Sequence, residues 1–374
     1  MKFSKTLVAS AAMLTAAFVA QAEVKTDGLL EIYGRASFSV DQLDDGDKYS
    51  RMNLSSNASR LGFRGSKKIG ELTGIWQIEQ EVQFNLSNSY SATDGKTTET
   101  NRLASRDTFA GLQGDFGTVR VGKFDTPFKV AREAFNLFGD QLGDMRNLTR
   151  VGSAKFDERL NNMLEYQSPV MGGFQAKLAY SFHSGTSATT TNGVDNKEDA
   201  TSLSLGYKTG NLDAALAYET YGSETASTNK RDATRAALSY KLTPELRVAG
   251  FWQTANSKKT TTTPATDEGA DITGVGVEYM VTPKVALKAH YMNRKANAAN
   301  KDATMYTMGT EYRYNKELRF YASYAALDNG SASALAPWTE GRTAAPGSSS
   351  GALTTNGKTT TGLSAGGVSS HQKS

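Results

Sequence analysis

Apolar and polar residues alternate along much of this chain, and one hairpin-like pattern occurs five times. In each copy the first segment ends at a tyrosine, the chain turns, and the second segment runs to another aromatic residue. Alternation with a period of two gives a β-strand two unlike faces. The first segments end at Tyr166, Tyr207, Tyr240, Tyr279 and Tyr312, and the second at Tyr180, Tyr218, Trp252, Tyr291 and Tyr324. The pattern predicts five β-hairpins with aromatic residues at both ends of their strands.

The same alternation predicts sixteen strands over the whole chain. They cover residues 28–41, 50–66, 71–86, 101–115, 117–125, 158–169, 173–184, 199–209, 211–222, 231–242, 245–256, 270–281, 284–295, 303–314, 317–328 and 357–370. Short turns containing Gly, Pro and Asn alternate with long polar connections such as 185–198 and 329–356. An even strand number with this alternation is typical of an antiparallel transmembrane β-barrel, with the short turns in the periplasm.

The two faces of the predicted strands differ in polarity. In the first strand Leu30 and Ile32 share one face, whereas Glu31, Tyr33 and Arg35 share the other. In a barrel the first face contacts lipid and the second faces a water-filled lumen. A secreted soluble β-protein shows the same alternation, but sixteen strands with aromatic ends and an export signal favour the barrel.

The N-terminus predicts export. Lys2 and Lys5 precede an apolar run from Leu7 to Ala20, and Ala20-Gln21-Ala22 is a small-x-small cleavage site. We therefore expect residues 1–22 to be a signal peptide and residues 23–374 to form the barrel. The apolar run is shorter than the ~20 residues of a membrane helix.

Composition agrees with this interpretation. Mean hydropathy is −0.47, which suits a barrel because its lumen and loops are polar. The net charge of +4 gives no indication of a nucleic-acid partner. The chain has no cysteine, and strand closure would take the place of disulfides in an exported chain.

The sequence shows no pattern of a catalytic or metal site. His183, His290 and His371 lack the spacing of metal ligands, and no Ser/His/Asp arrangement is recognisable. We expect no enzyme activity, no metal and no cofactor.

Several motifs in the first half resemble those of the general porins of Gram-negative bacteria, and they occur in the order of that family. They lie at residues 31–35 (EIYGR), 59–65 (SRLGFRG), 105–112 (SRDTFAGL), 117–127 (GTVRVGKFDTP) and 159–163 (RLNNM). The resemblance implies a homotrimer of sixteen-stranded barrels in the outer membrane, in contact with lipid and lipopolysaccharide.

The resemblance also implies that the third external loop, residues 126–157 here, folds into the lumen and narrows the pore. Its composition supports this, since five apolar residues are out of place in a solvated loop. They are Phe128, Phe135, Leu137, Phe138 and Leu142.

By motif, the family's constriction places basic residues on the wall opposite acidic residues on the loop. The basic candidates are Arg35, Arg60, Arg64, Arg106 and Arg159, and the acidic candidates are Asp140 and Asp144. Alternation places Arg35, Arg60 and Arg64 on the wet face. Arg106 fits less well, because Asp107 would then share the lipid face with Phe109, so we expect a bulge or a subunit contact there.

The function expected is passive diffusion of ions and small hydrophilic solutes. A channel selective for anions such as phosphate or organic acids is the alternative, and Arg146 and Arg150 would add to its positive charge. An oligosaccharide channel would need a line of lumen aromatics, which the sequence lacks. An adhesin or structural barrel without conduction is a third class.

The predicted last strand departs from the family pattern. Alternation fails after Val368, two glycines are adjacent at Gly366 and Gly367, and no aromatic residue ends the strand. We expect barrel closure to be weakest here, with residues 369–374 frayed or extending into the periplasm.

Overall fold

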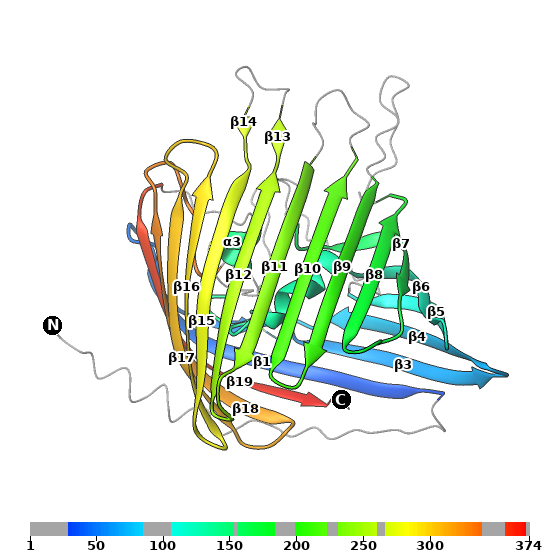
Figure 1. The fold of residues 1–374 in the computed structure, drawn as a ribbon. Helices are drawn as coiled ribbons and strands as arrows, with labels where there is room; N and C mark the ends of the chain where they lie inside the picture. Colours follow the sequence, from blue (N-terminus) through cyan, green and yellow to red (C-terminus); the bar gives the residue numbers. More distant parts are fainter. Residues whose placement is uncertain are drawn as a thin grey trace, which may run out of the picture.

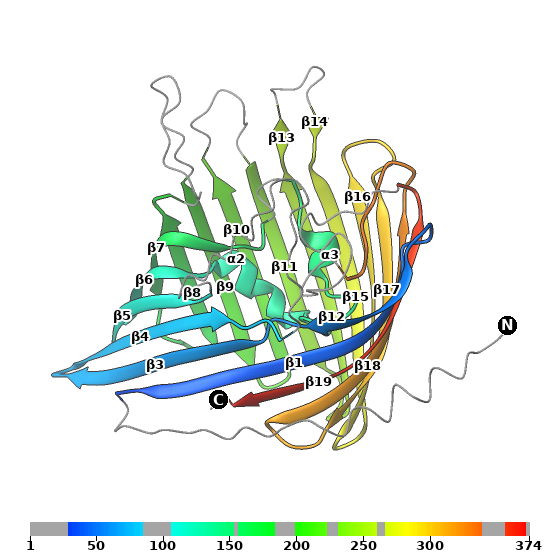
Figure 2. The same cartoon turned by 180° about the vertical axis from the view of Figure 1, so that it is seen from behind.

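One antiparallel sheet closes on itself to form a barrel (Figures 1 and 2). The structure, a computed structural model, describes residues 29–84, 106–152, 156–183, 199–222, 231–259, 266–338 and 356–371. Within these residues the large sheet has seventeen strands, but β2 and β3 follow one another along β1 and occupy one position. The last strand, β19, pairs with β1. The predicted sixteen-stranded antiparallel barrel is therefore confirmed.

Most strand bounds lie within three residues of the alternation pattern. The strands are β1 (Glu31–Asp44), β2 (Ser50–Ser56), β3 (Arg60–Ile69), β4 (Leu72–Glu81), β5 (Thr108–Gly114), β6 (Gly117–Asp125), β7 (Arg159–Gln167), β8 (Phe174–Ser181), β9 (Ala200–Thr209), β10 (Leu212–Tyr221), β11 (Arg231–Lys241), β12 (Leu246–Asn256), β15 (Ala270–Thr282), β16 (Val285–Ala296), β17 (Ala303–Arg313), β18 (Leu318–Asn329) and β19 (Thr359–His371). However, β4 ends at Glu81 rather than at 86 and β5 begins at Thr108 rather than at 101; residues 85–86 and 101–105 of those two predictions lie outside the described residues. A separate two-stranded sheet, β13 (Lys258–Lys259) with β14 (Thr266–Asp267), lies in a connection predicted to be a loop.

The described helices are short. They are α2 (Pro127–Val130), the 3₁₀ helix η2 (Ala131–Ala134) and α3 (Arg146–Thr149), all between β6 and β7. No helix among the described residues has the length and apolar character needed to cross a membrane.

The predicted second strand, 50–66, is interrupted at residues 57–59. Ala58 has a φ of 53°, in the left-handed region that strands do not use. Side chains satisfy the groups around the break: Asn57 donates to Ser39 Oγ at 2.9 Å, and Ser59 Oγ donates to the Ser37 carbonyl at 3.1 Å. Local side-chain hydrogen bonds thus replace ladder bonds that the alternation pattern predicted.

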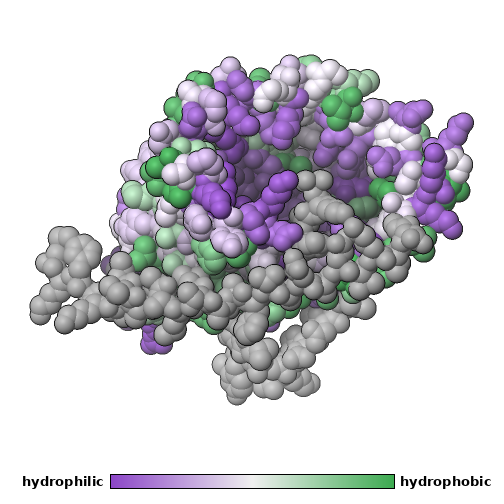
Figure 3. Space-filling model, turned by 90° about the horizontal axis from the view of Figure 1, so that it is seen from below, coloured by the Kyte–Doolittle hydropathy of each residue, from purple (hydrophilic) through white to green (hydrophobic). Residues whose placement is uncertain are grey.

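The interior of the barrel is polar. Viewed from the end with the short turns, the molecule is hollowed, and hydrophilic residues gather around the hollow (Figure 3). The inner face includes charged side chains such as Glu165 on β7, Arg235 on β11 and Lys288 on β16, each at most 6% exposed. These residues alternate along their strands with exposed apolar neighbours such as Leu164 and Leu287.

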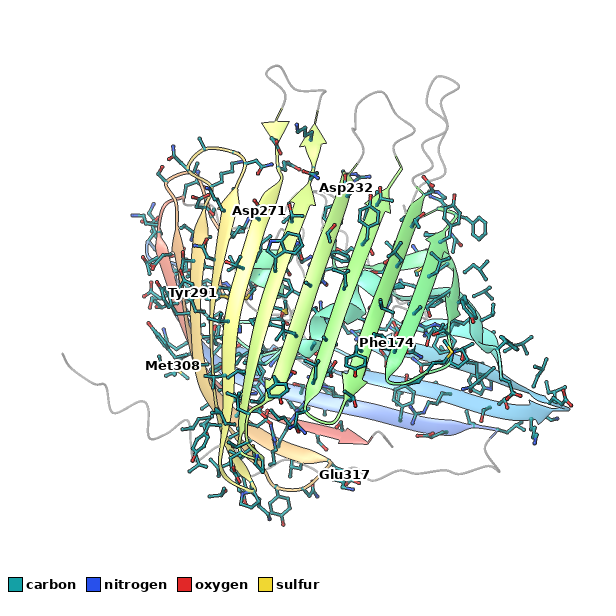
Figure 4. The ribbon with its side chains drawn as sticks, viewed as in Figure 1. Phe174, Asp232, Asp271, Tyr291, Met308 and Glu317 are labelled. Atoms are coloured by element: carbon teal, nitrogen blue, oxygen red, sulfur yellow. The ribbon has the colours of Figure 1, made fainter. Side chains whose placement is uncertain are left out.

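The outer face has an apolar band between polar ends. Phe174, Tyr291 and Met308 project outward, while Asp232 and Asp271 lie toward the long connections and Glu317 toward the short turns (Figure 4). This is the distribution of a barrel wall that faces lipid between two aqueous sides.

The two aromatic rows are close together within this band. Tyr240 pairs with Val248 and Trp252 pairs with Ala236, so the rows are four residues, or about 13 Å of strand, apart. Leu242 and Val281 extend the exposed apolar surface beyond the first row. The rows are therefore nearer to one another than the limits of a band about 25 Å tall.

The seam between the last and first strands is paired from Gly34 to Asp44 of β1. Ser369, Ser370 and His371 pair with Ala36, Arg35 and Gly34, and Ser369 also pairs with Leu318. The expectation that fraying begins at Ser369 is wrong, because ladder hydrogen bonds use backbone groups and do not need the missing aromatic side chain. Residues 372–374 of that expectation lie outside the described residues.

Candidate functional site

The connection between β6 and β7, residues 126–157, forms one wall of the candidate site through its described residues, 126–152 and 156–157. We refer to it as the β6–β7 segment. Thr126 begins it by capping α2, where its hydroxyl accepts a hydrogen bond from the Lys129 amide at 3.2 Å, and Pro127 suits the first helical turn. The apolar side chains predicted to leave water are buried: Phe128, Phe135, Phe138 and Leu142 are at most 1% exposed.

Contacts tie this segment to the inner faces of distant strands. The rings of Phe135 and Phe251 on β12 are 5.4 Å apart. Arg247, also on β12, donates to the Ala134 carbonyl at 2.8 Å. Near the middle of the segment, the Gly143 amide donates to the Pro337 carbonyl at 2.8 Å.

Arg235 on β11 binds residues near both ends of the β6–β7 segment. Its guanidinium donates to the Phe128 carbonyl (3.0 Å), the Phe156 carbonyl (3.1 Å) and Asp157 Oδ1 (3.2 Å). It also donates twice to Gln253 Oε1, at 3.0 and 2.7 Å. Every N–H of this fully buried side chain therefore has an acceptor.

A cavity of about 600 Å³ lies between the β6–β7 segment and the strand wall. Charged side chains dominate its lining. Among the described residues the basic ones are Arg35, Arg60, Arg106, Lys129, Arg132, Arg146, Arg159, Lys288 and Arg319, and the acidic ones are Glu81, Asp125, Glu133, Asp140 and Glu311.

Asp140 bridges the tip of the segment to the wall. It accepts from Arg35 on β1 at 2.8 Å and from Arg146 at 2.8 Å. Burial alone would raise the pKa of the Asp140 carboxyl, but Arg35 and Arg146, with Arg60 and Arg106 farther away, hold this pKa well below its ordinary value. Asp140 therefore stays ionised at the cavity surface.

Arg60 and Arg106 share one carboxylate. Glu79 accepts from Arg106 Nε at 2.6 Å and from the Tyr33 hydroxyl at 3.0 Å. The one ion pair of Arg60 within the described residues is also with Glu79, at 3.7 Å, beyond hydrogen-bond distance. Among Arg35, Arg60, Arg106 and Arg159, Arg60 therefore has the longest distance to its nearest ion-pair partner.

Arg159 completes this basic wall. It pairs with Asp107 and, at 2.8 Å, with Asp125. Arg106 and Asp107 both precede β5, so strand alternation does not constrain the direction of Arg106.

The expected lipid-facing position of Phe109 is wrong. Its ring is 6.0 Å from that of the buried Phe124, and the Arg120 guanidinium lies 4.8 Å above it. Phe109 thus shares the inner face with Asp107, and the β4–β5 register contains no irregularity. The bulge or subunit contact expected at Arg106 is not required.

Two predicted members of the site lie outside the cavity lining. Arg64 pairs with Glu31 at 2.7 Å. Asp144 is 1% exposed; it accepts from the Asp140 amide at 2.8 Å and from Arg146 at 2.7 Å. Asp144 therefore fixes the backbone amide of Asp140. It also positions the Arg146 side chain, which binds the Asp140 carboxylate.

Sequence reasoning missed a second group of lining charges. Lys129, Arg132 and Glu133 come from the segment. From the opposite wall, Lys288 and Glu311 pair at 3.1 Å. Alternation could have found the last two, since each is flanked by outward residues, whereas the irregular segment gives no such signal.

The described histidines are separate from this cavity. His290 is buried against Phe135 and Phe138, with ring centroids 6.0 and 4.9 Å away. No group of three or more His, Asp or Glu side chains with metal-binding geometry occurs within the described ranges.

Comparison with known proteins adds family information to this geometry. A family model for Gram-negative porins matches residues 9–332. An outer membrane porin protein of Bordetella pertussis is 30% identical over 235 residues, which are 58% of this chain and 59% of that protein. The chain thus spans less than two thirds of the first curated relatives it matches.

Solved structures share the fold over nearly their whole length. The anion-selective porin from Comamonas acidovorans has a TM-score of 0.75 and 23% identity, covering 91% of this chain and 99% of that one. OmpT of Vibrio cholerae, in its trimer form, has a TM-score of 0.62 and 17% identity, with 91% and 99% covered.

Proposed function

Because this chain belongs to the Gram-negative porin family, we propose that it forms a water-filled diffusion channel that passes ions and small hydrophilic solutes and favours anions. Its location is the bacterial outer membrane. The observation that carries the proposal is the cavity lining, where nine described side chains are basic and five are acidic.

The preference for anions depends on where the charges lie. Glu79, Asp144 and Asp157 pair with lining arginines but do not line the cavity, and each is at most 6% exposed. Coulomb energy falls with distance, so the lining guanidinium groups act more strongly on an ion in the cavity than these carboxylates do. The solved porin described as anion-selective, which shares the fold, supports this assignment.

The β6–β7 segment is the constriction in this proposal. Its Asp140 lies opposite the arginines of β1 and β3, and this places a field across the cavity. Polar solutes and ions are solvated by both charged rows, whereas an apolar solute would have to displace oriented water.

Reversal potentials of single channels in a KCl gradient test the proposal. The unaltered channel should favour chloride. Arg60→Gln should shift the permeability ratio toward potassium by about fivefold, since one charge about 4 Å away is worth ~1 kcal/mol in water. Asp140→Asn should shift it toward chloride.

A triple variant neutralising Arg35, Arg60 and Arg159 should shift the potential further toward cations. Arg64→Gln serves as the control, because Arg64 lies outside the cavity lining and should leave the potential unchanged. Equal potentials for the unaltered channel and both arginine variants would contradict the assignment of the constriction. A folded barrel without any conductance would contradict the channel itself.

The alternative, a channel selective for phosphate or organic acids, predicts a different dependence of conductance on salt concentration. Conductance through a general porin rises in proportion to salt concentration, whereas a channel with a binding site saturates. The measurement is conductance against concentration for chloride, phosphate and a dicarboxylate.

The assembly included in the proposal is a homotrimer in contact with lipid and lipopolysaccharide, with residues 1–22 removed on export. The trimer form of OmpT supports the oligomeric state. Heat-modifiable gel mobility measures it, and N-terminal sequencing of the mature protein tests the cleavage site.

A further inference from the structure

We propose that three wall glycines, Gly274 and Gly276 on β15 and Gly362 on β19, are sockets for apolar side chains of the β6–β7 segment and set the width of the channel. The inference deepens the proposed function and rests on it. These glycines would determine how far the segment projects toward the arginine wall, and so which solutes pass.

The clearances show that segment side chains occupy the space of the missing Cβ atoms. A Cβ on Gly276 would lie 2.7 Å from Leu137 Cδ1. On Gly274 it would lie 2.9 Å from Phe135 Cζ, and on Gly362 it would lie 2.8 Å from Leu142 Cδ1. Carbon atoms in contact are normally about 3.5–4.0 Å apart, so no side chain fits without displacing the segment residue.

Backbone conformation does not explain these glycines. None of the three has a positive φ, the usual reason for glycine at a turn or bulge. They lie inside regular antiparallel strands, where glycine costs about 0.5–1 kcal/mol relative to alanine. The space that they leave for the segment is a physical reason for glycine at these positions.

The segment contacts the sockets through Phe135, Leu137 and Leu142 and the arginine wall through Asp140, and Leu137 also lines the cavity. Phe135 and Leu142 are completely buried on the socket side. On the cavity side, Asp140 reaches Arg35 at 2.8 Å. A side chain added at a socket therefore pushes the segment toward the arginine wall, because the other side of the socket is the sheet itself.

Gly276 gives the clearest test, because its nearest neighbour is the end of the Leu137 side chain and its next contacts are at 3.5 Å. In the series Gly276→Ala, Val and Leu, single-channel conductance should fall stepwise, by about twofold for Leu, because conductance follows pore diameter. Liposome-swelling rates should fall more steeply for a disaccharide than for a monosaccharide.

Gly206 provides the matched control. It lies on β9, two residues from the inward-facing Ser204, and a Cβ there would meet only the Gln175 carbonyl at 3.8 Å. The same series at Gly206 should leave conductance and swelling unchanged. Folding of every variant is checked by heat-modifiable gel mobility.

A compensating pair separates displacement of the segment from general damage. Gly276→Leu combined with Leu137→Ala should recover most of the conductance of Leu137→Ala alone, since the smaller segment residue vacates the socket. Unchanged conductance in folded Gly276→Leu, an equal effect at Gly206, or no recovery in the pair would each overturn the socket assignment. In all these outcomes a conducting, anion-preferring parent channel leaves the proposed function intact.

Discussion

Arg235 shows how one buried charge can organise a site that it does not line. Removing a guanidinium from water costs several kcal/mol unless its charge and donors are matched. Here Asp157 supplies the charge, and Gln253 with the carbonyls of Phe128 and Phe156 accepts the remaining N–H groups. Because Phe128 lies near the start of the β6–β7 segment and Phe156 near its end, this one side chain holds both ends of the segment against β11.

Replacing Arg235 should therefore release the segment. Arg235→Met keeps the apolar volume but leaves Asp157 and two buried carbonyls without this donor, so we expect a loss of about 3–5 kcal/mol in the free energy of unfolding. Urea unfolding in lipid vesicles measures it, and single-channel recordings should show added noise.

Arg247→Met is the control for this prediction. Arg247 is only partly buried, and within the described residues its hydrogen bond to the segment is to the Ala134 carbonyl. We expect a loss of about 1 kcal/mol there. Equal stability of the two variants would show that Arg235 does not anchor the segment.

At the level of elements, the connection after β18 supports the tip of the segment. Asn329 holds residues 330–338 in place: its side chain donates to the Leu335 carbonyl and accepts from the Leu335 amide, both at 2.9 Å. This places Trp338, which is fully buried, in a cluster with Leu43, Leu142 and Ala325. The connection thus covers the side of Leu142 that the strand wall leaves open.

Trp338→Ala should loosen the tip without opening the barrel. Truncating a buried Trp costs about 3–5 kcal/mol, and here the loss should appear as mobility of Asp140. We expect conductance to fluctuate between levels and chloride preference to rise, because Asp140 leaves Arg35 more often.

Trp252→Ala is the matched control, since Trp252 is 42% exposed on the outer face. It should leave the current steady. Steady current in Trp338→Ala, with the barrel folded, would contradict the supporting role of this connection.

At the scale of the whole molecule, closure depends on a close approach at Gly366. A Cβ there would collide with the Phe38 carbonyl oxygen on β1 and would lie 2.6 Å from Tyr321 Cζ, so this glycine allows both β1 and the Tyr321 ring to approach β19 closely. The Tyr321 hydroxyl in turn accepts from Asn57 at 3.2 Å, across the seam that β19 makes with β1. Gly366 belongs to the glycine pair that is predicted from the sequence to weaken this strand. In the structure its lack of a side chain leaves space for the Tyr321 ring, which lies across the seam.

Gly366→Val should impair closure, whereas Gly367→Val should not. The first substitution collides with the Phe38 carbonyl oxygen of β1 and with the Tyr321 ring, at an overpacking cost of about 1–3 kcal/mol. At Gly367 the nearest side-chain atom, Phe320 Cδ1, is 3.4 Å away on the outer face. The yield of heat-modifiable folded protein measures the difference, and equal yields would show that the Tyr321–Gly366 contact does not control closure.

The sequence by itself determined the strands, their order and most of their faces. Alternation is a local property, and each strand in the lipid-facing wall must follow it because its two sides meet lipid and water. Alternation placed Arg35 and Arg60 on the wet face, the motifs placed Arg159 beside them, and all three line the cavity. The apolar composition of residues 126–157 likewise predicted burial of Phe128 and Phe135.

Only the tertiary structure decided what these residues meet. The partners of Arg35 and Arg235 in the β6–β7 segment are 105 and 107 residues away, and closure of the barrel sets which side chains face each other across the lumen. Alternation also fails where the backbone leaves the ladder, as at Ala58. Residues 106 and 107 precede the β5 ladder, so alternation counted from them placed Phe109 on the wrong face. Side-chain and backbone hydrogen bonds replace the ladder at such points, and a pattern with a period of two does not encode them.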